Sequence, residues 1–239
     1  MPTAVLLSGG LDSAVLLAEE AAHDEVQPIY VSVGFAWEEA ERNAVAGFLE
    51  AARIRRVRRL ASLSVDMRDV YAATHWAITG RPPAYNTPDE DVYLAGRNIV
   101  LLGKAGVFCA SAGIGRLLMG TLGHNPFPDA TPAFRAAMAA TLSLGLAFPI
   151  EIDAPYARVG KAEVIRRGIA AGVPLARTLS CMNPVSRGRE DFADSAKSSR
   201  PHFQFLHCGR CSKCRERHDA FLEAGVVDPT DYADRAYTS

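Results

Sequence analysis

One short stretch near the start of the chain constrains the fold most. Residues 4–17 read AVLLSGGLDSAVLL, in which an apolar run ends at Ser8, Gly9 and Gly10 and a second apolar run follows. This arrangement is typical of a buried strand, a tight glycine turn and a helix. Glycine lets backbone N–H groups approach an anion closely, and the N-terminus of the following helix attracts negative charge. The stretch therefore predicts a phosphate-binding turn, although it lacks the lysine of a P-loop.

Strand-like and helix-like runs alternate along the rest of the chain. We expect strands at 3–8, 26–33, 54–60, 116–121 and 148–155, and helices at 12–22, 37–52, 95–113, 132–144 and 160–172. This alternation favours an α/β fold, a doubly wound parallel five-stranded sheet with helices on both faces. Ligands bind such sheets beyond the carboxyl ends of the strands. The glycine turn is expected at that edge.

Composition limits the classes of protein that the chain can represent. Its 239 residues suit one large domain with a small appendage. A net charge of −1 provides no overall field for nucleic acid or an anionic membrane. No apolar run is long enough to span a membrane, and the chain enters a strand-like run without a basic segment before it. We therefore expect a cytoplasmic protein that has neither a membrane nor a nucleic acid as a partner.

The character of the sequence changes near residue 178. We expect an α/β domain at 1–177 and a C-terminal subdomain at 178–239, which is rich in small and charged residues. Residues 66–94 lack clear periodicity and are rich in Pro and Asp, which indicates a long loop or lid. Residues 185–201 have the composition of a mobile insertion.

The cysteines predict a metal site. Cys208, Cys211 and Cys214 are each separated by two residues, which is a spacing at which thiolates can face one ion. Cys181 is the natural fourth ligand; the alternatives are His202, His207 and His218. Zn²⁺ is the expected metal, with an iron–sulfur cluster as the chemical alternative. The basic residues that could offset the thiolate charge, or face an anionic ligand, are Arg210, Lys213, Arg215 and Arg217. Cys109 lies in an apolar helix and is expected in the core.

The turn resembles a known signature. SGGLDS, residues 8–13, is similar to the SGGxDS motif of the PP-loop ATP pyrophosphatases, which have the adenine nucleotide alpha-hydrolase-like fold. The resemblance implies that the loop holds the pyrophosphate end of ATP while a substrate oxygen attacks the α-phosphate. No P-loop lysine is then needed, because the γ-phosphate is not transferred. Asp12 is expected to hold Mg²⁺, and the Ser8 and Ser13 hydroxyls to donate to phosphate oxygens. The expected ATP site comprises Leu7, Ser8, Gly9, Gly10, Leu11, Asp12, Ser13 and Arg97.

Further motifs resemble one family within that superfamily. Together with CGRCSKCRER, the segments YLAGRN (93–98), FPDATPAF (127–134), IEIDAPYARVGKAEVIRRG (150–168) and TLSCMNP (178–184) are similar to the 7-cyano-7-deazaguanine synthases of queuosine biosynthesis. The resemblance implies that Arg97 and Lys161 lie near the ATP phosphates and that Asn98 orders the loop. It also implies that Asp129 lies near a deazaguanine and that Cys181 is a zinc ligand. Asp12, Ser13, Arg97 and Lys161 are thus the expected catalytic residues.

The resemblance implies a reaction and its partners. ATP would adenylate the carboxylate of 7-carboxy-7-deazaguanine, ammonia would form the amide, and a second ATP would activate the amide oxygen to give the nitrile. ATP, Mg²⁺ and a structural Zn²⁺ are the implied cofactors, and a homodimer is the implied assembly. The expected substrate-binding residues are Gly34, Trp37, His124, Phe127 and Asp129, with packing as the alternative role of Trp37.

The sequence also departs from the family pattern. VGFAWE (33–38) retains only Gly34 of the usual Tyr-Gly-Gln-Arg-His, GTLGHNP (120–126) lacks an acidic pair, and the gap from Cys181 to Cys208 is long. The alternative is therefore a divergent paralogue that adenylates a related carboxylate and stops at the amide, or transfers the activated group to a protein or nucleic acid. Sulfur transfer to tRNA would need a basic surface, which the net charge of −1 disfavours. A binding module without activity is disfavoured by the intact SGGLDS motif, Arg97 and Lys161.

Overall fold

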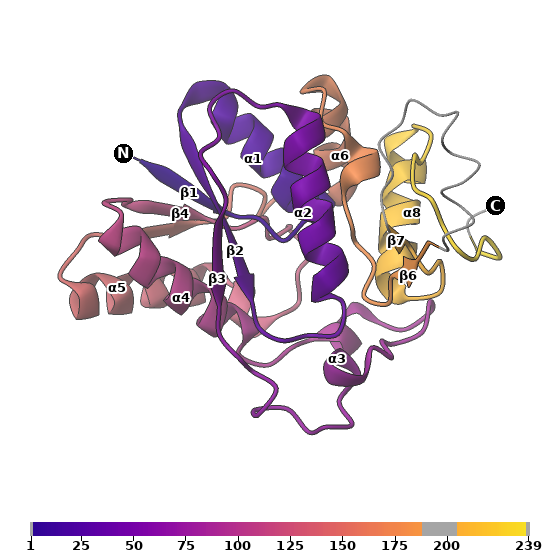
Figure 1. The fold of residues 1–239 in the computed structure, drawn as a ribbon, viewed down its shortest axis with the longest axis horizontal. Coiled ribbons are helices and arrows are strands. Elements are labelled where there is room, and N and C mark those ends of the chain that lie inside the picture. Colours follow the sequence, from indigo (N-terminus) through magenta and orange to yellow (C-terminus); the bar gives the residue numbers. More distant parts are fainter. Residues whose placement is uncertain (1, 188–204, 238–239) are drawn as a thin grey trace.

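A computed structural model describes residues 2–187 and 205–237 of the chain. Within these residues a five-stranded sheet has the order β3-β2-β1-β4-β5, and every neighbouring pair is parallel (Figure 1). Its strands are β1 (Thr3–Leu6), β2 (Val26–Ser32), β3 (Ala61–Ser64), β4 (Arg116–Leu118) and β5 (Glu151–Asp153). The expected doubly wound fold is confirmed.

The sheet order creates a switch point beside the first strand. From β1 the chain moves outward to β2 and β3, and it then returns to place β4 on the other side of β1. Thr3 consequently pairs with both Val26 and Arg116. The loops that follow β1 and β4 leave the same edge of the sheet, and a ligand site is expected between them.

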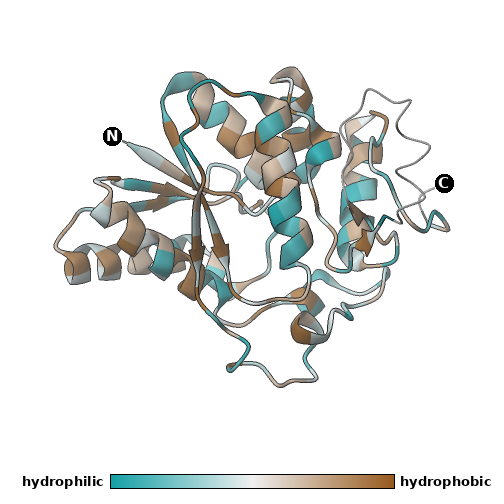
Figure 2. Cartoon of the chain, in the orientation of Figure 1, coloured by the Kyte–Doolittle hydropathy of each residue, from teal (hydrophilic) through white to brown (hydrophobic). Residues whose placement is uncertain are grey.

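Helices cover both faces of the sheet (Figure 1). The helices are α1 (Leu11–His23), α2 (Glu38–Ala52), α3 (Trp76–Thr79), α4 (Arg97–Ser111), α5 (Pro132–Leu146), α6 (Lys161–Ala170) and α8 (Ser212–Ala224). Phe48 of α2 and Ile165 of α6 join α1 in one buried hydrophobic cluster. Leu102 and Cys109 of α4 join the opposite cluster, which confirms the core position of Cys109. Figure 2 shows that α4 and α5 consist largely of hydrophobic residues, whereas α2 and α8 mix hydrophilic and hydrophobic ones.

The third strand was predicted in the wrong place. β3 is Ala61–Ser64, and the predicted strand at 54–60 is a turn in which Val57 forms one isolated bridge with Val26. Arg56 Nη1 donates to the carbonyls of Ala22 and His23, so the basic run caps the end of α1 instead of extending the sheet. Its weak apolar alternation comes from Ile54, Val57 and Leu60, which are partly buried against the hydrophobic cluster of α1 and α2.

The long segment at 66–94 is largely irregular, as expected. It contains α3 and a short 3₁₀ helix, Asp89–Val92. Its later part is fastened to the start of α8, because Ala84 forms a bridge with Cys211 and Arg215 Nη2 donates to the Thr87 carbonyl at 3.0 Å. Its movement as a lid stays a prediction.

The C-terminal segment packs onto the α/β core. Ala220 and Phe221 of α8 lie in the same hydrophobic cluster as α1 and α6. A two-stranded antiparallel sheet, β6 (Val185–Ser186) with β7 (Phe205–Leu206), precedes α8. The predicted division at residue 177 stays a prediction, and most of the insertion predicted at 185–201 falls outside the described residues. Among the helices described, none combines the length and apolar character needed to cross a membrane.

Candidate active site

The glycine turn begins the site at the carboxyl end of β1. Gly9 has φ +79°, and a Cβ added there would lie 3.0 Å from the Glu41 carbonyl oxygen. Gly10 is the N-cap of α1, and no side chain caps the helix. Ser13 Oγ donates to the Gly10 carbonyl at 3.0 Å, and the Ser8 and Ser13 hydroxyls lie 3.3 Å apart. A bare helix N-terminus with two neighbouring hydroxyls is suited to binding an anion.

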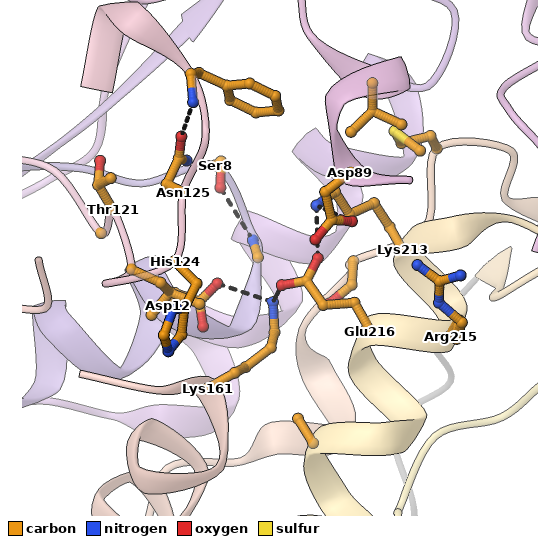
Figure 3. Close-up of a pocket in the computed structure, with 18 of the residues that line it drawn as sticks. Ser8, Asp12, Asp89, Thr121, His124, Asn125, Lys161, Lys213, Arg215 and Glu216 are labelled. Atoms are coloured by element: carbon orange, nitrogen blue, oxygen red, sulfur yellow. Dashed lines mark hydrogen bonds and ion pairs between the residues drawn. The ribbon is translucent and has the colours of Figure 1, made fainter. Parts of the chain in front are cut away.

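Asp12 and Lys161 face each other beside this turn (Figure 3). Lys161 Nζ lies 3.1 Å from Asp12 Oδ2 and 2.7 Å from Glu216 Oε1. Burial raises the pKa of Asp12 above its ordinary value, although Lys161 opposes this rise. Burial works against the charged form of Lys161 as well, but Asp12 and Glu216 outweigh it and raise the pKa of the ammonium above its ordinary value. Lys161 is therefore a fixed cation next to the glycine turn.

Arg97 approaches the site from the start of α4. Its Nη2 lies 3.9 Å from Glu41 Oε1, and its guanidinium lies 5.8 Å from the centre of the Phe35 ring. The backbone N–H of Asn98 donates to Asp129 Oδ2 at 3.1 Å, and Asn98 Nδ2 donates to the Asp129 carbonyl at 3.1 Å. Asn98 thus ties α4 to the loop after β4, and the loop-ordering role that the resemblance implies for it stays a prediction.

A pocket of about 610 Å³ opens between these groups. Its lining residues include Ser8, Gly10, Asp12, Trp37, Arg97, His124, Phe127 and Lys161. A second pocket of about 250 Å³ shares Ser8, Gly10, Asp12, Arg97 and Phe127 with the first and adds Ser13 and Asp129. The two pockets therefore meet at the glycine turn, and together they could hold a nucleotide and a small acid.

Other residues predicted for the site lie in the core, outside the pockets or in the pocket wall. Leu7 and Leu11 are buried in the core, where they fix the two sides of the turn. Gly34 lines neither pocket; its N–H donates to Glu38 Oε1 at 3.0 Å. Trp37 is only 4% exposed and stacks on Trp76, with ring centroids 5.5 Å apart. Trp37 therefore has the packing role that was its predicted alternative, and it also forms part of the pocket wall.

The four C-terminal cysteines form a buried cluster. The Sγ atoms of Cys181, Cys208, Cys211 and Cys214 all lie within 4.8 Å of one another. Cys211 Sγ is 3.5 Å from Cys214 Sγ and 3.9 Å from Cys181 Sγ. Zn–S bonds of about 2.3 Å in a tetrahedron separate the sulfurs by about 3.8 Å. The donor set therefore fits one zinc ion, whereas an iron–sulfur cluster spreads its cysteines around several irons.

The histidine alternatives for the fourth ligand differ in position. His207 Nε2 accepts a hydrogen bond from the Ser180 N–H at 3.0 Å. His218 Nδ1 lies 3.6 Å from Asp228 Oδ2, and His202 lies outside the described residues. Cys181 is the residue whose sulfur joins the other three, and the N–H groups of Asn183 and Cys208 donate to it.

Sequence reasoning did not single out several charged residues of the site. Glu216 lies between Lys161 and Lys213, and burial of its carboxyl is outweighed by these two ammonium groups, which lower its pKa to about 2. Glu41 lines the pocket and accepts a hydrogen bond from Trp37 Nε1 at 2.9 Å. Glu216 lies within the CGRCSKCRER segment, which was interpreted only for its sulfurs and cations, so its neighbours were the available signal.

Fold and site together define a class of protein. A glycine turn at the switch point of a parallel sheet, with an acidic residue in the first turn of the next helix and a facing lysine, is the arrangement of an ATP-dependent PP-loop enzyme. Comparison with known sequences gives the particular family. The family described as "Queuosine biosynthesis protein QueC" matches residues 3–225. This chain belongs to the QueC family and is an ATP-dependent ligase.

Individual relatives are similar along nearly their whole length. A 7-cyano-7-deazaguanine synthase of Anaeromyxobacter dehalogenans is 35% identical over 243 residues, covering 96% of this chain and 94% of the relative. One from Azoarcus sp. is 32% identical over 239 residues, covering 97% and 96%. Among solved structures, a predicted subunit of a tRNA methyltransferase from Methanocaldococcus jannaschii aligns with 100% of this chain and 94% of its own, at 16% identity and a TM-score of 0.44.

Proposed function

We propose that this chain converts 7-carboxy-7-deazaguanine to the nitrile 7-cyano-7-deazaguanine with ATP and ammonia. The observation that carries the proposal is the convergence of the glycine turn, Asp12, Lys161 and Arg97 on one pocket of about 610 Å³. The shared name of the relatives gives the product, 7-cyano-7-deazaguanine, and the family resemblance of the sequence implies 7-carboxy-7-deazaguanine as the substrate. That name favours the synthase over the divergent paralogue.

The first step activates a carboxylate. A carboxylate oxygen of the substrate attacks the α-phosphorus of ATP, pyrophosphate leaves, and an acyl adenylate forms. The N–H groups of the turn, the Ser8 and Ser13 hydroxyls, Lys161 and Arg97 are the groups that stabilise charge on the phosphates. Asp12 Oδ1 is buried and has no hydrogen-bond partner among the residues that the structure describes, so this oxygen is the one suited to Mg²⁺. Bound Mg²⁺ would withdraw negative charge from the phosphates.

Two further steps lead from the adenylate to the nitrile. Ammonia attacks the acyl carbon, AMP leaves, and loss of a proton gives the amide. The amide oxygen then attacks the α-phosphorus of a second ATP, and pyrophosphate and a proton are released. Departure of AMP with loss of the remaining N–H proton forms the nitrile. Each nitrile therefore consumes two ATP and yields two AMP and two pyrophosphate.

The remaining groups have supporting roles in this proposal. His124, Phe127 and Asp129 line the pockets as substrate contacts, Trp37 forms part of the wall, and Gly34 acts through Glu38. Zinc is structural, because four buried sulfurs leave no open position for a reacting group. The homodimer remains a prediction from the resemblance.

Mass spectrometry of the reaction products tests the proposal. The purified protein is incubated with 7-carboxy-7-deazaguanine, ATP, Mg²⁺ and ammonium, with a parallel reaction that lacks ammonium. We expect the nitrile, with two AMP for each product, and no amide or nitrile in the parallel reaction. Amide as the final product would contradict the dehydration step. Failure to release pyrophosphate would contradict the adenylation itself.

A further inference from the structure

Five alternating charges cross the pocket, from four separate elements. Asp12 belongs to α1, Lys161 to α6, Lys213 and Glu216 to α8, and Asp89 to the 3₁₀ helix (Figure 3). Lys213 Nζ lies 2.6 Å from Glu216 Oε2 and 3.6 Å from Asp89 Oδ1. Each oxygen of Glu216 therefore faces a different lysine.

Glu216 competes with Asp12 for one ammonium group. Lys161 Nζ lies closer to Glu216 Oε1, at 2.7 Å, than to Asp12 Oδ2, at 3.1 Å. The side chain of Lys161 is only 12% exposed, so water screens these interactions weakly. Without the negative charge of Glu216, Asp12 would be the carboxylate left to attract Lys161. Lys161 would then neutralise Asp12, whose Oδ1 has no hydrogen-bond partner within the described part of the chain.

The cysteine cluster fixes the position of Glu216. Cys211 is the N-cap of α8, and its carbonyl accepts from the N–H groups of Cys214 and Arg215 at 3.0 and 3.2 Å. Glu216 follows one turn into the helix, and Phe221 anchors the same helix in the core. The carboxylate of Glu216 is thus held opposite the glycine turn by a rigid element.

We propose that Glu216 is a positioning residue that shares the Lys161 ammonium with Asp12 and so leaves Asp12 able to bind Mg²⁺. This inference rests on the proposed function only in taking the glycine turn as the site of Mg²⁺ and ATP. It assigns a role in the ATP site to the helix that carries the cysteine ligands Cys211 and Cys214.

Calorimetry of ATP binding at a series of Mg²⁺ concentrations tests the inference. The proteins compared are the wild type, Glu216→Gln, Lys161→Met and the double variant, with Glu163→Gln as the control. Glu163 lies on α6 with Lys161 but outside both pockets, paired with Arg166 and Arg167. We expect Glu216→Gln to raise the Mg²⁺ concentration for half-maximal ATP binding about tenfold, and Glu163→Gln to leave it unchanged. In the Lys161→Met background, Glu216→Gln is expected to have no further effect.

The other outcomes would overturn the inference. An unchanged Mg²⁺ requirement in Glu216→Gln would show that Glu216 does not regulate access to Asp12. The same shift with Lys161→Met present would show that Glu216 does not act through Lys161. If Glu216→Gln lost its zinc, the change in its Mg²⁺ requirement would be attributed to a disturbed fold. In that case Glu216→Asp, which retains the negative charge, should also fail to restore Mg²⁺ binding. These measurements contain neither deazaguanine nor ammonia, so they can fail or succeed independently of the proposed reaction.

Discussion

Lys161 Nζ lies 3.1 Å from Asp12 Oδ2, although the two residues are 149 positions apart in the chain. Asp12 stands in the first turn of α1, and Lys161 is the first residue of α6. Cations are disfavoured at helix N-termini, so the carboxylates of Asp12 and Glu216 stabilise Lys161 where the helix dipole does not. The pair joins the N-termini of two helices at the carboxyl edge of the sheet.

Asp12→Ala should abolish pyrophosphate release without unfolding the protein. Burial raises the pKa of Asp12, so its ionised form is disfavoured by burial, and after its replacement Lys161 keeps the 2.7 Å contact with Glu216 Oε1. We expect a loss of roughly 100-fold or more in the rate of pyrophosphate release, as for the removal of one charge-stabilising group, with cooperative thermal unfolding retained. Steady-state release of pyrophosphate and thermal unfolding measure the two effects. Asp24→Ala, at the exposed end of α1, is the matched control and should retain the wild-type rate.

Gly9→Ala should destabilise the protein and weaken ATP binding. Gly9 has φ +79°, and the added Cβ would lie 3.0 Å from the Glu41 carbonyl and 3.2 Å from Ala44 Cβ. Both strain and crowding push α2 away from the turn, which should lower the free energy of unfolding by about 1–3 kcal/mol. Gly47→Ala in the same α2 has nothing within 4 Å and should instead stabilise the helix by about 0.5–1 kcal/mol. Equal stability of the two variants in urea would contradict the assigned turn geometry.

Cys211→Ser should remove the metal. Its sulfur lies within the cluster of four, and a structural zinc contributes directly to folding. We expect zinc content to fall far below one ion per chain, and a chelator to lower the melting temperature of the wild type but not of the variant. Cys109→Ala is the control, because Cys109 is buried in α4 away from the cluster. Wild-type zinc content in Cys211→Ser would rule out this ligand set.

Arg217→Met should strongly destabilise the protein, although the Met side chain retains much of the apolar stem of Arg. Arg217 is fully buried. Its guanidinium donates to Thr230 Oγ1 at 2.6 Å, to Thr178 Oγ1 at 2.9 Å and to the Leu175 carbonyl at 3.0 Å. Replacement removes these charge-assisted hydrogen bonds from a buried site, although the Leu175 carbonyl still accepts from Thr178 Oγ1 at 2.7 Å. We expect the loss to cost about 3 kcal/mol or more.

Arg210→Met tests whether burial is the reason for the destabilisation expected of Arg217→Met. The Arg210 side chain is 73% exposed and pairs with Asp234, so its replacement should change the free energy of unfolding by less than about 1 kcal/mol. Denaturant unfolding of both variants gives the comparison. A similar loss in the two would mean that the buried hydrogen bonds of Arg217 contribute little.

Local sequence patterns were enough to predict the parallel sheet, apart from its third strand, and the glycine and cysteine motifs. Parallel strands that are covered on both faces are largely apolar, and β1 and β2 could be located because both of their faces are buried. The glycine turn and the cysteine spacing were readable because their geometry is set by residues a few positions apart. The edge strand β3 could not be located from the sequence, since Ala61–Ser64 is only half covered and the neighbouring basic run has a similar alternation.

The charges that meet in the pocket could be identified from the three-dimensional fold alone. Lys161 faces Glu216 across 55 positions, and Trp37 stacks on Trp76 from a different segment. No local pattern encodes such pairs, because they depend on the order of the strands and on how α8 packs against α6. The cysteines depend on both levels. The spacing of Cys208, Cys211 and Cys214 predicted a metal site, and the fold brings the sulfur of Cys181 to these three.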